Sequence, residues 1–199
     1  MPQNNLLQNR EKKGRKTMPS QNRREFIKMG LGAFVGTLLP WEAMAKTLKG
    51  FDARRSLSFF NTHTDEKLDV CYFDEVGYRP EALDQINHIL RDYRTDTIKE
   101  IDPGLLDLLF TLKCRISPRD AFHVISGYRS PETNERLRRH SSGVAQKSFH
   151  TKGQAIDIRL PGYNTAQLRN LCVRMNAGGV GYYSRSDFVH IDVGPVRTW

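Results

Sequence analysis

Two short stretches of this 199-residue chain contain the side chains that proteins use to bind metal ions. The stretch from Ser148 to Asp157 holds His150 and Asp157, and some thirty residues later His190 follows. Two imidazoles and a carboxylate fill three corners of a zinc tetrahedron and leave the fourth for water, which is the ligand count of a catalytic zinc. Zinc polarises carbonyl groups and lowers the pKa of bound water to about 7. We therefore predict a Zn²⁺ site at His150, Asp157 and His190.

Alternation along two predicted strands places these ligands together. Residues 155–160 and 188–193 both carry apolar residues at every second position, which suits a core-facing side. Asp157 and His190 fall in the opposite phase, so they emerge on the same sheet face if the two strands are neighbours. His150 lies in the loop just ahead and can fold over them. We expect the metal site on that sheet face.

These residues resemble the zinc site of the D-alanyl-D-alanine metallopeptidase superfamily, which includes vancomycin-resistance dipeptidases, VanY-type carboxypeptidases and phage endolysins. The match consists of S-x-H-x-x-G-x-A-x-D, carried by Ser148, His150, Gly153, Ala155 and Asp157, and a late D-x-x-H at Asp187 and His190. The likeness is strongest to the periplasmic murein endopeptidases and runs from about Leu57 to Trp199, with Arg91-Asp92-Tyr93-Arg94 included. It implies that His150, Asp157 and His190 bind zinc.

The same resemblance implies two catalytic residues. Ser126–Ser130 with Asn134 is similar to the arginine turn of the superfamily, which would place Arg129 on a substrate carboxylate or oxyanion. The alternative for Arg129 is a turn residue with its charge in water. Asp187 occupies the position where relatives carry a Glu or Asp that accepts a proton.

Strand phase complicates the role of Asp187. Position 187 would point toward the core with Val189, unless the turn at Ser186 twists it outward. Asp192 has a different expected role, since it could hold the second nitrogen of a ligand histidine, or else lie in solvent.

Periodicity and turn residues predict one compact α+β domain, with a small antiparallel sheet flanked by helices. Asp102, Ser130 and Thr165 are the expected helix caps. The expected elements are a hairpin of residues 57–61 and 68–73, further strands at 122–126, 155–160, 180–183 and 188–193, and helices from Pro80 to about Tyr93, from 103 to 115, from 131 to 139 and from 165 to 176.

Histidines and cysteines outside the motif are given ordinary roles. We expect His63 to be solvent-exposed in the hairpin link and His123 to be a strand residue. Three widely spaced cysteines argue against a disulfide framework and a thiolate zinc site. Cys114 and Cys172 are expected to be small buried hydrophobes on helices, although oxidation of one pair, with Cys71 as the third candidate, stays open.

The N-terminal 45 residues read as a signal peptide. Arg23 and Arg24 precede an apolar stretch from Met29 to Leu39 and an Ala-x-Ala triplet ending at Ala45. The paired arginines resemble a twin-arginine export signal, which implies folding before export by the twin-arginine machinery. We predict a signal at 1–45 and a peptidase domain at 46–199, a periplasmic location and no stable membrane span after cleavage. The start codon, Met1 or Met18, stays open.

Charge points to an anionic surface rather than to nucleic acid. The net charge is +9, but residues 1–45 hold eight of the 31 basic and three of the 22 acidic residues, which leaves +4. We predict an exported zinc-dependent murein endopeptidase that hydrolyses peptide cross-links of peptidoglycan. The alternatives are a D,D- or L,D-carboxypeptidase of the same superfamily and a non-catalytic zinc-containing peptidoglycan-binding module.

Overall fold

A computed structural model describes residues 54–116, 121–141 and 143–199. The predicted signal peptide at 1–45, the cleavage site after Ala45 and the alternative start at Met18 lie outside the described residues. Within the described part, none of the helices has the length and apolar character needed to cross a membrane.

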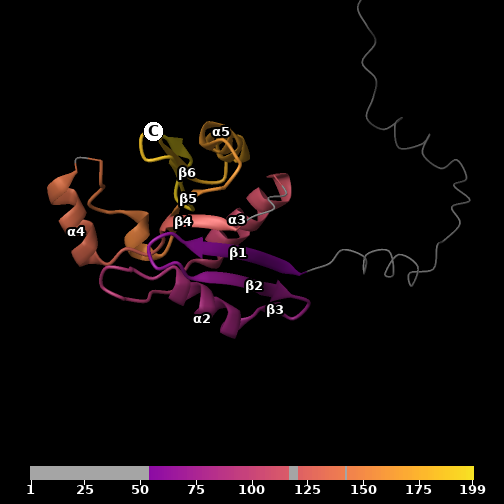
Figure 1. The fold of residues 1–199 in the computed structure, drawn as a ribbon. Coiled ribbons are helices and arrows are strands. Elements are labelled where there is room, and N and C mark those ends of the chain that lie inside the picture. The colour runs from indigo at the N-terminus through magenta and orange to yellow at the C-terminus, as the bar shows by residue number, and fades with distance from the viewer. Residues whose placement is uncertain (1–53, 117–120, 142) are drawn as a thin grey trace, which may run out of the picture. The chain divides into compact units, whose positions relative to one another are not determined.

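The described chain folds into four α-helices, one short 3-10 helix and eight strands (Figure 1). The helices are α2 (Pro80–Ile89), α3 (Pro103–Ile116), α4 (Pro131–His140), η1 (Phe149–Lys152) and α5 (Thr165–Met175). The strands are β1 (Arg55–Asn61), β2 (Lys67–Asp74), β3 (Gly77–Tyr78), β4 (Phe122–Ser126), β5 (Ala155–Arg159), β6 (Gly179–Tyr183), β7 (Phe188–Asp192) and β8 (Arg197–Thr198).

All eight strands form one sheet in the order β3-β2-β1-β4-β5-β7-β6-β8. The predicted hairpin is confirmed as the antiparallel pair β1–β2, and β5 pairs with β7 as expected. The prediction of a small antiparallel sheet was wrong, because β1–β4 and β6–β8 are parallel pairs. Parallel pairing needs a long crossover, and α2 with α3 supplies it between β1 and β4.

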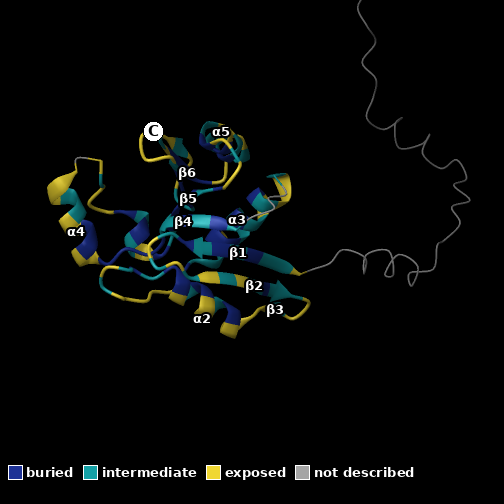
Figure 2. Ribbon diagram, viewed as in Figure 1, coloured by how far each residue is buried: buried dark blue, intermediate teal, exposed yellow. Residues whose placement is uncertain are grey.

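The apolar core lies between one face of the sheet and the helices. Leu108 and Leu112 of α3, Cys172 of α5 and Val180 and Ile191 of the sheet line one small internal space. Figure 2 shows buried and intermediate residues along the central strands β1 and β4, and exposed residues along α2. The core therefore occupies the face opposite Asp157 and His190, in agreement with the predicted strand phase.

Two predicted helix caps are confirmed and one was wrong. Asp102 accepts a hydrogen bond from the Gly104 amide, and Ser130 accepts one from the Thr133 amide. Asn164, not Thr165, caps α5 by accepting from the Gln167 amide. Asparagine is at least as good a cap as threonine, and Asn164 directly precedes Thr165, so the sequence pattern alone does not separate the two candidates.

Cys114 is exposed, which corrects the expectation that it is buried, whereas Cys172 is buried as predicted. The buried residues of α3 include Leu109 and Leu112. Position 114 is two residues beyond Leu112, a rotation of about 200°, so it faces away from the core.

Gly153 allows η1 to lead directly into β5. Its φ is +68°, and it ends η1 in a left-handed conformation. A side chain there would also overlap the backbone carbonyl oxygen of Glu100. The same segment is held close because the Asp102 amide donates a hydrogen bond to the Gly153 carbonyl. Both the conformation and the close approach require glycine.

We expect Gly153→Ala to lower the free energy of unfolding by at least about 2 kcal/mol, because it adds steric overlap to left-handed strain. Gly162→Ala is the matched control, since Gly162 has a φ of +72° with open space around it. The control should cost about 1 kcal/mol. Denaturant unfolding measures both, and equal losses would show that the Glu100 contact is unimportant.

Candidate metal centre

The three predicted metal ligands come together and are all buried. His150 Nε2 lies 3.2 Å from Asp157 Oδ1 and 3.1 Å from His190 Nδ1, and His190 Nδ1 lies 2.8 Å from Asp157 Oδ1. No other group of three or more potential metal-binding side chains occurs within the ranges that the structure describes. Adjacent ligands of a tetrahedral zinc with bonds of about 2.0–2.1 Å lie about 3.3 Å apart, so these spacings fit such an ion.

The second nitrogen of each histidine is held by an acceptor. His150 Nδ1 lies 2.7 Å from the Gly127 carbonyl oxygen, and His190 Nε2 lies 3.0 Å from Asp192 Oδ2. Each of these nitrogens must donate its proton, because its partner only accepts. The remaining lone pairs of His150 Nε2 and His190 Nδ1 then face each other and the Asp157 carboxylate. Three converging electron-pair donors repel one another unless a proton or a metal ion lies between them.

Burial and charge act in opposite directions on these groups. Burial acts to raise the pKa of Asp157, but the charges and hydrogen bonds of His150 and His190 outweigh it and lower that pKa. Burial lowers the pKa of His150, against the pull of Asp157. It also acts to lower the pKa of His190, but hydrogen bonds to Asp157 and Asp192 raise that pKa above its usual value. Because a metal ligand must release its proton, metal binding at His190 is favoured as the pH rises.

Local structure fixes each ligand. β5 and β7 pair in a register that puts Asp157 directly opposite His190, as strand phase predicted. His150 is in η1, which is capped by Ser148, whose hydroxyl accepts from the His150 amide. The His150 carbonyl in turn accepts from the Arg129 amide at 3.2 Å. The 3-10 turn is thereby tied to the arginine turn on one side and to β5 on the other.

Asp192 anchors His190 from behind, which confirms one of the two expectations for this residue. The carboxylate is fully buried, and it accepts from the amides of Gly179 and Gly194 and from the Arg197 guanidinium at 2.6 Å. Burial acts to raise its pKa, but bonds from His190 and Arg197 lower it. It is therefore an ionised acceptor that orients the His190 ring.

Arg129 lies next to the three ligands and is 9% exposed. Its Nη2 is 3.5 Å from Asp157 Oδ2 and 3.3 Å from Ser126 Oγ, while its Nε has no partner. The turn is held by buried Asp92, which accepts from the amides of Ser130 and Arg94. The alternative of a solvated turn residue is wrong, because the guanidinium is buried with its Nε left without a partner in the described part of the chain.

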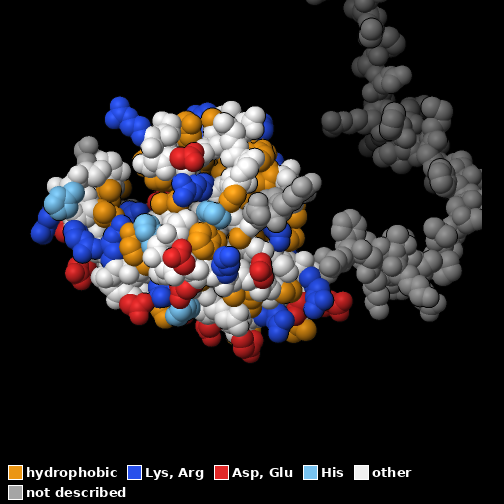
Figure 3. All heavy atoms as spheres, in the orientation of Figure 1, with side chains coloured by type: hydrophobic (Ala, Val, Ile, Leu, Met, Phe, Trp, Pro, Cys, Tyr) orange, Lys and Arg blue, Asp and Glu red, His pale blue; other side chains and the backbone are white. Residues whose placement is uncertain are grey.

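A cleft of about 890 Å³ opens over the three ligands. Its charged lining side chains, apart from the histidines, are four cations, Arg94, Arg129, Lys147 and Arg197, and one carboxylate, Asp157. Figure 3 shows Lys and Arg side chains gathered beside α4 on the visible face. The aromatic lining residues are Phe149, Tyr183, Phe188 and Trp199. Such a cleft suits a ligand that is anionic and partly apolar.

Asp187 is not brought to this cleft. It has a φ of +51°, its Oδ1 accepts a hydrogen bond from the Thr165 hydroxyl, and it lines a different hollow with His123 and Arg159. The role of Asp187 as proton acceptor therefore stays a prediction. The backbone does twist at Asp187, but it directs the carboxylate toward the start of α5.

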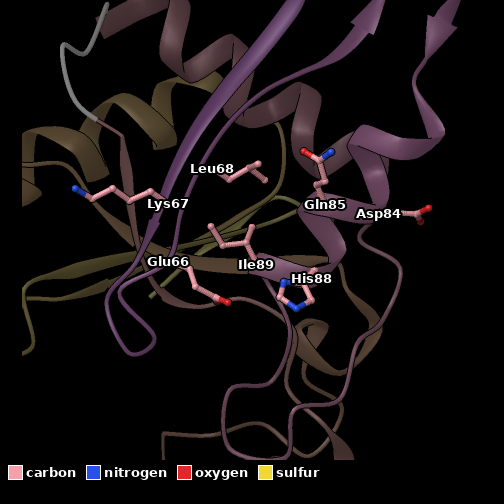
Figure 4. Close-up of a pocket in the computed structure, with 7 residues that line it drawn as sticks. All are labelled: Glu66, Lys67, Leu68, Asp84, Gln85, His88 and Ile89. Carbon is pink, nitrogen blue, oxygen red and sulfur yellow. The ribbon is translucent and has the colours of Figure 1, made fainter.

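The remaining histidines behave largely as expected. His63 is exposed, although it lines the rim of the cleft, where its ring stacks on Tyr93 at 3.9 Å. His123 is a residue of β4. His88 lies beside Glu66 in a separate hollow against α2 (Figure 4). Arg91 pairs with the Glu66 carboxylate at 2.8 Å, so this hollow is not organised like the metal centre.

Comparison with known proteins assigns the chain to a family. A peptidase M15 family model described as peptidoglycan L,D-endopeptidase MepK matches residues 50–199. The chain belongs to this MepK family of peptidases. It is 47% identical to peptidoglycan L,D-endopeptidase MepK of Escherichia coli (strain K12) over 89% of this chain and 97% of that protein. It is 37% identical to the probable peptidoglycan L,D-endopeptidase MepK of Haemophilus influenzae over 90% and 96%.

The family assignment confirms the resemblance read from the zinc motif. Sequence reasoning about this MepK-family chain missed two features of the site. Asp92 was noted only as part of a matching segment, and its burial signals the anchoring role that charge alone does not reveal. Trp199 and Tyr183 were not singled out, because aromatic residues near a strand end read as ordinary sheet residues.

Proposed function

We propose that this protein is an exported zinc-dependent endopeptidase that cleaves peptide cross-links in peptidoglycan, with zinc on the sheet face. The observation that carries the proposal is the convergence of His150 Nε2, Asp157 Oδ1 and His190 Nδ1. The other ring nitrogen of each histidine already donates its proton to an acceptor outside this group. The printed names of the relatives, peptidoglycan L,D-endopeptidases, support the substrate. The proposed periplasmic location rests on the paired arginines of residues 1–45.

Each part of the cleft has a distinct task. His150, Asp157 and His190 would hold a zinc ion, which would supply Lewis-acid chemistry to polarise a carbonyl and to activate water at neutral pH. Arg129 binds a carboxylate of the substrate or the negative charge that develops on the attacked carbonyl. Its Nε has no partner among the described residues and can therefore still donate a hydrogen bond. Its Nη2 lies 3.5 Å from Asp157 Oδ2, which places the guanidinium next to the three ligands. Arg94 and Lys147 extend the positive lining, which suits the carboxylate-bearing peptides of peptidoglycan.

One observation favours a non-catalytic zinc-containing binding module as the second candidate. Among the described residues that line the cleft, Asp157 is the only carboxylate, and it faces the metal position. Hydrolysis needs a proton acceptor within reach of the attacking water. Asp187 would have to leave Thr165 to serve, whereas binding of a peptide needs no such acceptor.

Digestion of purified peptidoglycan sacculi tests the function. We expect the purified protein to convert cross-linked muropeptides into monomers, as resolved by mass, and a zinc chelator to abolish the conversion. Loss of single terminal residues with cross-links intact would instead identify a carboxypeptidase. Unchanged muropeptides with zinc bound would contradict catalysis and support the binding module.

Asp187→Ala tests the proton acceptor. If Asp187 accepts the proton, turnover should fall by at least about 10²-fold with zinc content unchanged. Thr165→Val is the matched control, since it removes the hydrogen bond to Asp187 and keeps the carboxylate. The control should retain most of the turnover. Equal, modest losses in both variants would show that Asp187 acts only by anchoring the turn to α5.

A further inference from the structure

The β6–β7 hairpin places a tyrosine beside the metal centre. Gly181 of β6 pairs directly with His190 of β7, and Tyr183 pairs with Phe188. Residues two apart on a strand share a face, so Tyr183 projects on the same side as His190, one diagonal step away. Long side chains reach across such diagonals. Tyr183 lines the cleft above the ligands, whereas its neighbour Tyr182 projects from the opposite face.

The ring and hydroxyl of Tyr183 are held in place. Its ring stacks on Phe188 with 4.5 Å between centroids. Its hydroxyl oxygen accepts a hydrogen bond from the Trp199 indole Nε1 at 3.0 Å. The Trp199 ring occupies the space over Gly181, where a Cβ would come within 2.6 Å of it, and its centroid is 5.2 Å from that of His190. A glycine opposite the ligand therefore makes room for the indole that orients the phenol.

The proton of this hydroxyl is left to donate. Among the residues that the structure describes, no acceptor for it is found, while the oxygen already accepts from an N–H. Accepting that bond withdraws electron density and strengthens the hydroxyl as a donor. Arg129 and Tyr183 both line this cleft, so both can contact the same bound ligand.

We propose that Tyr183 is a catalytic residue whose hydroxyl, oriented by Trp199, donates a hydrogen bond to the carbonyl oxygen of the scissile peptide bond as negative charge develops there. The proton stays on the phenol throughout, and Arg129 supplies the second donor or holds a substrate carboxylate. This inference rests on the proposed peptidase function. A preorganised donor of this kind acts mainly in the transition state, and removing one typically lowers kcat by 10²–10³-fold, as seen in other enzymes.

The test compares Tyr183→Phe with Tyr182→Phe, which loses the same hydroxyl from the opposite face of the same strand. We expect Tyr183→Phe to lower kcat on cross-linked muropeptides by about 10²-fold with KM changed by less than about threefold. Tyr182→Phe should match the unaltered protein. Trp199→Phe, which keeps an aromatic ring but loses the N–H, should lower kcat by about tenfold.

Binding of a phosphinate analogue of the cross-link gives a readout that does not depend on turnover. Tyr183→Phe should lower the affinity for the analogue by about the same factor as it lowers kcat. It should leave the zinc content and the affinity for the product unchanged. Unchanged kcat in Tyr183→Phe, or a loss confined to KM, would overturn the inference while the peptidase function stands. An unaltered protein that cleaves nothing would overturn both.

Discussion

The mutual repulsion of three electron-pair donors is the constraint on which the site depends. His150, Asp157 and His190 present their unshared pairs to one another at 2.8–3.2 Å, inside a region from which water is largely removed. Without a proton or a metal ion between them this arrangement opposes folding, since buried polar atoms need partners. The surrounding contacts therefore hold the donors together at a cost that metal binding would offset.

Those contacts form two supports that meet at the metal position. On one side, Asp92 holds the arginine turn, whose Gly127 carbonyl fixes the tautomer of His150. On the other, Asp192 fixes His190 and is itself paired with Arg197. Arg197 also lies over the Trp199 ring, at 4.9 Å, so the final strand is part of the same support. Arg129 and Tyr183, which line the cleft, thus extend from the elements that orient the three side chains.

Sequence reasoning predicted the convergence of His150, Asp157 and His190 better than the structure around them. Period-2 alternation determined that Asp157 and His190 share a face, because side-chain direction along a strand is a local property. The parallel pairing of β1 with β4 depends on a crossover of some sixty residues and has no local signal. Asp187 illustrates the same limit. Its turn was foreseen, but its positive φ and its bond to Thr165 depend on where α5 begins, and the assigned cap was one residue away.

The most direct test of the central claim is anomalous X-ray diffraction at the zinc edge from crystals of the zinc-loaded protein. The account predicts one zinc ion bonded to His150 Nε2, Asp157 Oδ1 and His190 Nδ1 at about 2.0–2.2 Å, with Gly127 and Asp192 still accepting from the other ring nitrogens. Zinc bound at other residues, with these three side chains bonded only to one another, would contradict it.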